Sequence, residues 1–262
     1  MPAQDFRLAT DACHVWTLSL KQPAGVLERL QQSLSQDELQ RARRYRYARQ
    51  LRQFILTRGA LRELLGCYLD KAPAQCCITL SESGKPFVAA STSDGRSDAV
   101  HAGGHGFAHS GEIFFNVAHA GDQAIIAIAR GIEVGIDIEA HRVLDERQAL
   151  TDMILSPTEK ERWEALPEET RTCAFYALWT RKEAVAKAIG QGLLMELNTL
   201  GVSFEQGLPP RLLEIPVMYG RPQDWTLVAL EAATGYTAAL AAPVREIRIT
   251  QKTWQPQELP LH

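Results

Sequence analysis

Apolar residues along this chain change their period several times, and each change marks the expected start of a new element. Alternation and short apolar runs predict strands, whereas a repeat of three to four residues predicts amphipathic helices. The predicted strands cover residues 14–20, 76–80, 113–117, 124–129, 134–139, 200–204, 225–230 and 236–241. The predicted helices cover residues 26–34, 39–47, 50–69, 145–155, 157–166 and 168–189.

Each half of the chain offers several strands and one long helix, which predicts an α+β fold built from two related halves. The seam is expected near Arg130, with an N-terminal half over residues 1–130 and a C-terminal half over residues 131–262. No residue-level internal repeat is visible in the sequence. Residues 89–111 are rich in Ala, Ser, Gly, Asp and His and are expected to form a loose loop, and residues 255–262 a loose tail.

The composition narrows the class of protein. The chain has 262 residues, of which 45% are hydrophobic and 23% charged, as expected of a folded protein with a substantial core. No apolar run reaches the roughly 18 to 20 residues that cross a bilayer, and the first ten residues lack the apolar core of a secretory peptide. We therefore expect a cytoplasmic protein with no membrane partner. The five cysteines show neither C-x-x-C nor zinc-site spacing, so reduced thiols are expected.

Eight arginines between residues 41 and 62 make one segment strongly basic, although the formal net charge is −3. The acidic overall charge and the small number of aromatic residues argue against a nucleic-acid partner. An anion of the size of a nucleotide or of coenzyme A (CoA) fits the segment better. The sequence also lacks the P-loop, the dinucleotide-binding glycine motif, the serine-hydrolase elbow and the H-E-x-x-H zinc motif.

A pair of carboxylates is the first candidate for chemistry. Asp137 and Glu139 lie two residues apart on a predicted strand, so both project from one face while Ile136 and Ile138 project from the other. Carboxylates held this close repel each other, and a divalent cation such as Mg²⁺ or Mn²⁺ relieves the repulsion. An exposed polar strand end is the alternative that a lone Asp-x-Glu leaves open.

The predicted helix over residues 168–189 carries a second charged cluster. Glu183 and Lys187 lie four residues apart and share one helical face, and Trp179 one turn earlier is expected to anchor that face by packing. Taken alone, this pair is typical of a surface ion pair. Together with the first carboxylates, Glu183 can supply a third, and Lys182 and Lys187 add positive charge for a metal-bound, phosphorylated ligand.

Histidine offers one further candidate. His119 lies on a predicted turn between two strands, where it can donate to a phosphate or act as a general base. A solvated turn histidine is the alternative. The irregular spacing of His101, His105 and His109 in the loose loop does not predict a metal site.

Four segments, in order along the chain, resemble the motifs of the 4′-phosphopantetheinyl transferases. They are Gly84-Lys85-Pro86, Phe115-Asn116-Val117-Ala118-His119-Ala120-Gly121-Asp122, Val134-Gly135-Ile136-Asp137-Ile138-Glu139 and Trp179-Thr180-Arg181-Lys182-Glu183-Ala184-Val185-Ala186-Lys187. The resemblance implies the Sfp-type architecture, in which two pseudo-symmetric α+β halves of one chain bind CoA across their seam. It also implies a monomer, because the shorter branch of the family forms trimers.

The resemblance implies an enzyme that transfers the 4′-phosphopantetheine group of CoA to a serine hydroxyl of an apo carrier protein and releases adenosine 3′,5′-bisphosphate. The implied partners are acyl, peptidyl or aryl carrier domains of fatty acid, polyketide or nonribosomal peptide synthases. Two alternatives stay open. One is a CoA- or carrier-binding relative with little turnover, and the other is an unrelated Mg²⁺-dependent nucleotide hydrolase.

Position by position, the resemblance implies that Asp137, Glu139 and Glu183 hold Mg²⁺. Glu183 would also deprotonate the serine, and Lys187 would stabilise the phosphate under attack, so that both join Asp137 as the implied catalytic residues. The residues implied to contact CoA are Arg41, Arg44, Arg58, Lys85, His119, Lys182 and Lys187. The family commonly has serines where this chain has Ala118 and Ala120, so a hydroxyl expected near CoA is missing.

Overall fold

Two helices of 22 residues each, α3 (Ala48–Leu69) and α6 (Glu168–Ile189), are the longest elements of this computed structural model. The structure describes residues 6–89, 112–142, 147–191 and 195–256. The other α-helices are α1 (Ala24–Gln32), α2 (Gln36–Ala42), α4 (Arg147–Ile154) and α5 (Pro157–Glu164). Short 3₁₀ turns are η1 (Pro73–Gln75), η3 (Leu197–Thr199), η4 (Val217–Tyr219) and η5 (Pro222–Asp224).

The strands form two main sheets of matching order. Their bounds are β1 (Ala12–Ser19), β2 (Ile78–Leu80), β3 (Pro86–Val88), β4 (Ile113–Ala120), β5 (Gln123–Arg130), β6 (Gly135–Ala140), β7 (Gly201–Val202), β8 (Leu212–Glu214), β9 (Thr226–Leu230), β10 (Tyr236–Ala242) and β11 (Arg248–Thr253). One sheet has the order β11-β1-β5-β4 and the other β6-β10-β9, and the shared three-strand pattern is antiparallel in both. The prediction of two similar α+β halves is therefore confirmed.

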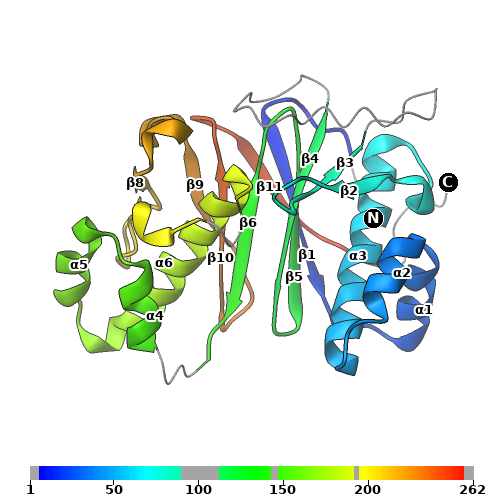
Figure 1. The fold of residues 1–262 in the computed structure, drawn as a ribbon, viewed down its shortest axis with the longest axis horizontal. Helices are drawn as coiled ribbons and strands as arrows, with labels where there is room; N and C mark the ends of the chain where they lie inside the picture. Colours follow the sequence, from blue (N-terminus) through cyan, green and yellow to red (C-terminus); the bar gives the residue numbers. More distant parts are fainter. Residues whose placement is uncertain (1–5, 90–111, 143–146, 192–194, 257–262) are drawn as a thin grey trace.

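The sheets lie between the helices, with α3 outside one sheet and α6 outside the other (Figure 1). Three apolar clusters correspond to these layers. The inner cluster joins the two sheets through small and β-branched side chains, among them Val15, Ala127 and Ile136. The outer clusters pack α3 and α6 onto their sheets, and Trp179 packs against the α6 cluster as predicted. In the described part of the chain, no helix is both long and apolar enough to cross a membrane.

The predicted bounds of α6 are confirmed, and local chemistry explains them. The helix begins after Pro167, with Glu168 and Glu169 in its first turn, where carboxylates favour the positive end of the helix dipole. It ends at Gly190, whose φ of 85° is a left-handed conformation that glycine adopts without a Cβ penalty.

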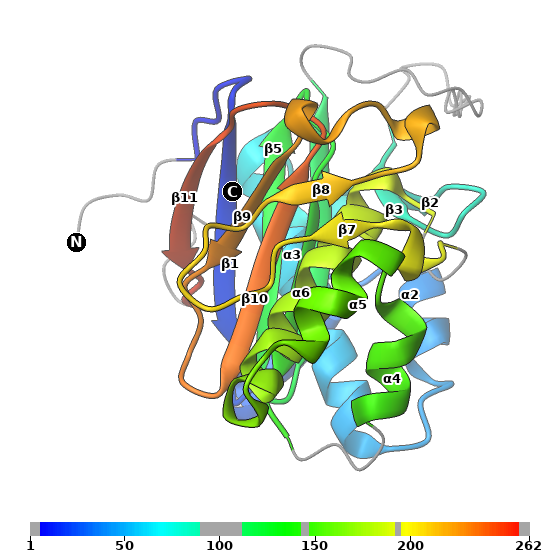
Figure 2. The same cartoon turned by 90° about the vertical axis from the view of Figure 1, so that its left-hand side faces the viewer.

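The last described strand crosses from one half to the other. β11 pairs in parallel with β1, so residues 248–253 belong to the N-terminal sheet (Figure 2). The sequence did not predict β11. The C-terminal half expected over residues 131–262 thus contributes one strand to the other half, while a division near Arg130 stays a prediction.

Other expected elements differ in extent. The helix expected over residues 39–47 is replaced by α2, which starts at a Ser35 capping box and ends at Ala42 before a turn. β4 runs three residues beyond its predicted end, so His119 lies on a strand and the prediction that it lies on a turn is wrong. The loose loop expected over residues 89–111 and the tail expected over 255–262 lie almost wholly outside the described residues.

Candidate functional site

The candidate site begins where α6 presses against β6. A Cβ atom on Gly135 would come within 2.0 Å of the Ala184 carbonyl oxygen, so only glycine allows this close approach. The contact sets the helix face that carries Glu183 and Lys187 beside the strand face that carries Asp137. As predicted from the alternation, Ile136 and Ile138 point instead into the core between the sheets.

An ion pair joins the two elements. The Lys187 Nζ atom lies 2.5 Å from Asp137 Oδ1 and donates a hydrogen bond to it. Asp137 is 5% exposed, and its second oxygen, Oδ2, is buried with no hydrogen-bond partner among the described residues. A buried carboxylate oxygen without a partner is costly, so this atom is a position where a cation would be favourable.

Glu139 and Glu183 share the electrostatic field of Asp137. Burial, together with repulsion from Asp137 and Glu183, raises the pKa of Glu139 to about 7, while Lys187 and Arg142 oppose the shift. Burial also raises the pKa of Glu183, with Asp137 raising it further and Lys187 opposing it. Like charges that are crowded and partly desolvated produce such shifts.

The donor set suits a hard divalent cation, since all three predicted ligands offer carboxylate oxygens. In the described ranges, no group of three His, Cys, Asp or Glu side chains is gathered closely enough to hold a metal ion as it stands. The Asp137 oxygen that lacks a partner among these described ranges, and the mutual repulsion of the carboxylates, nevertheless fit an ion bound between them.

His119 connects the carboxylate cluster to the N-terminal half. Partial desolvation, together with the positive charge of Lys187, lowers the pKa of His119, although much of its ring is solvent-accessible. The imidazole is therefore neutral at pH 7 and has one nitrogen that can donate and one that can accept. Its strand neighbours Ala118 and Ala120 pack into the apolar cluster between the sheets. Serines at these two positions would therefore direct their hydroxyls away from the His119 face.

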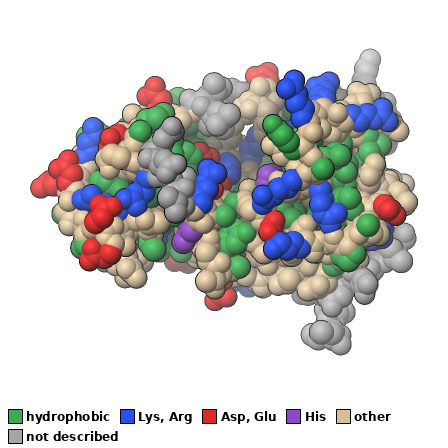
Figure 3. All heavy atoms as spheres, turned by 90° about the horizontal axis from the view of Figure 1, so that it is seen from below, with side chains coloured by type: hydrophobic (Ala, Val, Ile, Leu, Met, Phe, Trp, Pro, Cys, Tyr) green, Lys and Arg blue, Asp and Glu red, His purple; other side chains and the backbone are tan. Residues whose placement is uncertain are grey.

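A cavity of about 250 Å³ brings three of the predicted CoA ligands together. Arg41, Arg58 and His119 line it, with the apolar side chains of Phe54, Leu61 and Val117 among the walls. The Arg58 Nη1 atom is buried and has no hydrogen-bond partner in the ranges that the structure covers. Figure 3 shows Lys and Arg side chains gathered on this face beside the hollow between the two halves. The cavity is thus a cationic, partly apolar site suited to an anion that also has apolar surface.

The other predicted CoA ligands are placed differently. Arg44 is exposed in the turn after α2 and does not line the described cavity. The Lys85 Nζ atom lies 2.5 Å from Glu133 Oε2 and donates to the Ala188 carbonyl oxygen at 3.2 Å. Lys85 therefore caps the C-terminal end of α6 in this structure and does not line the cavity that holds Arg41 and Arg58.

The burial of Lys182 contradicts the prediction that this residue contacts a phosphate. The side chain is 0% exposed, and its Nζ atom lies 2.5 Å from Glu159 Oε2. It also donates to two carbonyl oxygens, so its three hydrogens are used inside the protein. The sequence offered a signal for this, because Lys182 lies about 100° around the helix from Glu183 and thus on another face.

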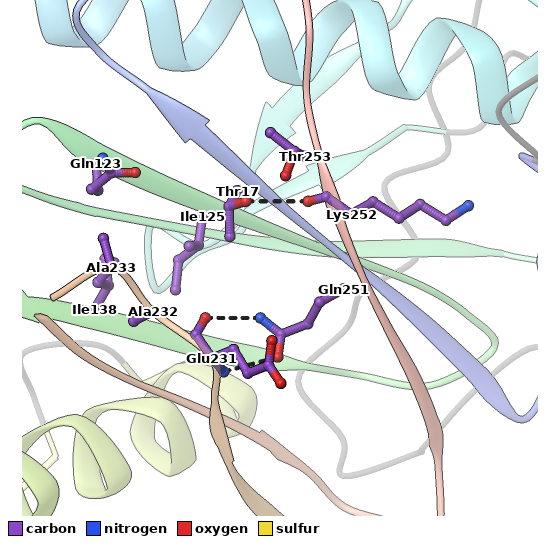
Figure 4. A pocket seen from close by; sticks show the side chains of 10 residues that line it. All are labelled: Thr17, Gln123, Ile125, Ile138, Glu231, Ala232, Ala233, Gln251, Lys252 and Thr253. Atoms are coloured by element: carbon purple, nitrogen blue, oxygen red, sulfur yellow. Dashed lines mark hydrogen bonds between the residues drawn. The ribbon is translucent and has the colours of Figure 1, made fainter. Parts of the chain in front are cut away.

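A larger cavity, of about 390 Å³, lies on the reverse side of β6. Ile138 contributes to its wall, and the Gln251 side chain there donates to the Glu231 carbonyl oxygen at 2.9 Å (Figure 4). None of the predicted site residues lines it. The candidate site is therefore on the face of β6 that carries Asp137 and Glu139.

Comparisons with known proteins point to one family. A family model described as the 4′-phosphopantetheinyl transferase superfamily matches residues 133–241. The 4′-phosphopantetheinyl transferase HetI of Nostoc sp. is 31% identical over 250 residues, covering 95% of this chain and 92% of the relative. A 4′-phosphopantetheinyl transferase of Bacillus subtilis is 24% identical over 181 residues, covering 68% and 70%.

A solved structure is also similar in part. The holo-[acyl-carrier-protein] synthase of Thermotoga maritima matches with a TM-score of 0.34 and 20% identity, covering 44% of this chain and 64% of that one.

Proposed function

The chain belongs to the 4′-phosphopantetheinyl transferase superfamily, and from this premise we propose that the protein transfers the 4′-phosphopantetheine group of CoA to a serine hydroxyl of an apo carrier protein. In this reaction the serine oxygen forms a new bond to the pantetheine-side phosphorus. The bond from that phosphorus to the nucleotide breaks, and adenosine 3′,5′-bisphosphate leaves with the electron pair.

One observation carries the proposal: two sites of opposite charge lie side by side. A cationic cavity holds Arg41 and Arg58, and a carboxylate cluster holds Asp137 and Glu139. His119 lines the first site, and partial desolvation, together with the charge of Lys187 in the second site, lowers its pKa. CoA carries phosphates at two separate places, a 3′-phosphate and a pyrophosphate, so a ligand of this kind matches both sites. We assign the 3′-phosphate to the cationic cavity, with Arg44 and Lys85 as further phosphate contacts only if they move.

The carboxylates are the proposed ligands of a divalent cation. Asp137, Glu139 and Glu183 would hold Mg²⁺, with Mn²⁺ as an alternative, and the bound ion would neutralise pyrophosphate charge. The buried Oδ2 of Asp137, which has no hydrogen-bond partner in the part of the chain that the structure describes, supports this assignment. Removing the ion with a chelator is expected to stop the reaction.

The chain's own side chains supply the remaining chemistry. Glu183 lies where burial favours its protonated form, which makes its carboxylate a stronger proton acceptor for the serine hydroxyl. Lys187 provides a fixed positive charge 2.5 Å from Asp137 Oδ1, and a phosphate oxygen nearby would share that charge. His119, neutral at pH 7, can donate one hydrogen bond to a phosphate oxygen.

Intact-mass analysis tests the activity. The protein is incubated with CoA, Mg²⁺ and apo acyl, peptidyl and aryl carrier domains, and each carrier is expected to gain one phosphopantetheine group if it is a substrate. Asp137→Asn should abolish the gain, whereas Asp152→Asn, an exposed aspartate on α4, should not. No mass gain on any carrier would overturn the proposal.

The alternative function is a relative that binds CoA or a carrier with little turnover. Calorimetry separates the two, because this alternative predicts CoA binding by the wild-type protein without any mass gain on a carrier. The choice among fatty acid, polyketide and nonribosomal peptide carriers is decided by the same panel. A monomeric state and a cytoplasmic location stay predictions, and light scattering on a sizing column tests the first.

A further inference from the structure

Each of the two long helices has a buried cation at the same helical position. Lys182 in α6 is 0% exposed, and Arg62 in α3 is 2% exposed, and each occupies the same place in its 22-residue helix. The Lys182 Nζ atom lies 2.5 Å from Glu159 Oε2, and the Arg62 Nε atom lies 2.6 Å from Glu38 Oε2. Both halves therefore contain a buried ion pair of the same kind, which the sequence did not reveal as a repeat.

Each glutamate in these pairs also caps a short helix. The Glu159 carboxylate accepts from the Ser156 backbone N–H at 2.8 Å at the start of α5, and Glu38 accepts from the Ser35 N–H at 2.9 Å at the start of α2. In both cases the glutamate is the third helical residue of a capping box. One carboxylate thus fixes a short helix and a long helix relative to each other.

The remaining hydrogens of each cation hold backbone carbonyls from neighbouring segments. Two carbonyl oxygens accept hydrogen bonds from each cation. At least one of the two belongs to the 3₁₀ turn that follows the long helix, η3 after α6 and η1 after α3. The acceptors are Ile154 and Leu197 for Lys182, and Pro73 and Cys76 for Arg62. Because these contacts surround the cation, rotation of the long helix about its axis would break several of them together.

The rotation of α6 decides where the candidate catalytic side chain lies. Glu183 directly follows Lys182 in the sequence, so it turns with the helix. A rotation of about 20° would move a carboxylate about 6 Å from the helix axis by about 2 Å. A displacement of about 1 Å at a reacting group is enough to lower a rate about 100-fold.

We propose that Lys182 is a positioning residue, whose buried ion pair with Glu159 fixes the rotation of α6 and thereby the place of Glu183. The inference rests on the proposed transferase activity, since that activity gives Glu183 its role. Lys182 itself touches neither CoA nor the metal ligands' oxygen atoms; it acts through the helix.

Arg62 is the corresponding residue of the N-terminal half. Arg58 lies one turn before it on α3, and the Arg58 Nε atom is 3.5 Å from Glu38 Oε1, the same carboxylate that holds Arg62. Arg58 lines the cationic cavity. The two ion pairs therefore serve different parts of the reaction: one sets a catalytic carboxylate, and the other sets a ligand-binding guanidinium.

Two double variants test the proposal with each half as the control for the other. Lys182→Met with Glu159→Gln, and Arg62→Met with Glu38→Gln, each remove both charges of one buried ion pair. The second double variant also takes away the Glu38 carboxylate that pairs with Arg58. For the first variant, kcat should fall at least about tenfold, while KM for CoA stays within about twofold. For the second, KM for CoA should rise at least about tenfold, with kcat within about twofold.

Two further measurements keep the result independent of folding losses. Hydrogen exchange of α6 backbone amides should quicken in the first variant and not in the second. Glu159→Asp, which keeps both charges and shortens one side chain by a methylene, should lower kcat several-fold without changing KM for CoA.

Equal losses of kcat in both double variants, in proportion to their folded fractions, would overturn the inference and leave the ion pairs a purely stabilising role. Unchanged kcat in the folded Lys182 variant would overturn it as well. Absence of transfer by the wild-type protein would instead refute the proposed function.

Discussion

Glu139 provides a prediction that links the candidate site to stability. Its pKa is raised from an ordinary 4.5 to about 7, chiefly by burial and by Asp137. The native state therefore holds this proton more tightly than the unfolded state does between these two values. The free energy of unfolding of the metal-free protein should accordingly fall as the pH rises from about 4.5 to 7, and the full penalty is present above pH 7. Glu139→Gln removes the titrating group and should flatten this part of the profile.

The structure gives the size of the effect. A shift from 4.5 to about 7 corresponds formally to about 3 kcal/mol. Glu139 is only partly buried, so solvent screening reduces the expected contribution to about 1–2 kcal/mol. The variant should therefore be about 1–2 kcal/mol more stable than wild type at pH 8 and nearly equal to it at pH 5. It should also lose transfer activity, because a proposed metal ligand is gone.

Urea unfolding in a chelating buffer at pH 5, 6, 7 and 8 measures the profile. Glu161→Gln, an exposed glutamate on α5, is the matched control and should follow the wild-type curve. Added Mg²⁺ should stabilise wild type more than Glu139→Gln, because only wild type keeps all the proposed ligands. A variant that is no more stable than wild type at pH 8, or that gains equally at pH 5, would refute the reasoning.

Three other predictions concern single residues. Arg58→Ala should raise KM for CoA about tenfold or more, since a charge-assisted hydrogen bond contributes about 1.5–3 kcal/mol. The KM for 3′-dephospho-CoA should stay nearly unchanged. Equal shifts of the two KM values in steady-state kinetics would contradict the assignment. Lys187→Ala should lower kcat by about 100-fold or more while circular dichroism shows a folded protein, and near wild-type turnover would argue against its role. Lys182→Met alone should lose about 3–5 kcal/mol of unfolding free energy in urea, since it leaves Glu159 buried and unpaired, whereas a loss below about 1 kcal/mol would indicate that water reaches the pair.

The sequence predicted those elements whose ends are determined by neighbouring residues. Proline before α6 and glycine after it fixed both ends of that helix, and the alternation in β6 correctly separated Asp137 and Glu139 from the isoleucines between them. β11 escaped prediction because its pairing partner is β1, far away in the sequence, and its own burial is slight. Strand formation there depends on a tertiary partner that no local pattern announces.

The candidate site could be predicted in part. The charged side chains of the carboxylate cluster follow from helix and strand periods, which placed Glu183 and Lys187 on one face. The burial of Lys182 could not be predicted from these periods, because it depends on an ion pair with Glu159, which lies on another helix. The capping position of Glu159, three residues after Ser156, can be read from local sequence, but a second role for the same carboxylate needs three-dimensional information. The same is true of Lys85, whose partner Glu133 and carbonyl acceptor on α6 come from the other half.

The pairing of β11 with β1 has a consequence for synthesis on the ribosome. The Arg248 side chain in β11 donates two hydrogen bonds to Asp11, the residue before β1, and these residues lie 237 positions apart in the sequence. Until β11 emerges, one edge of β1 has no neighbour, and the Trp16 ring lacks the Lys252 ammonium group that lies 5.2 Å from it. During synthesis the N-terminal half therefore has an open sheet edge until β11 is made. Such an edge is a surface that chaperones bind and from which aggregates grow.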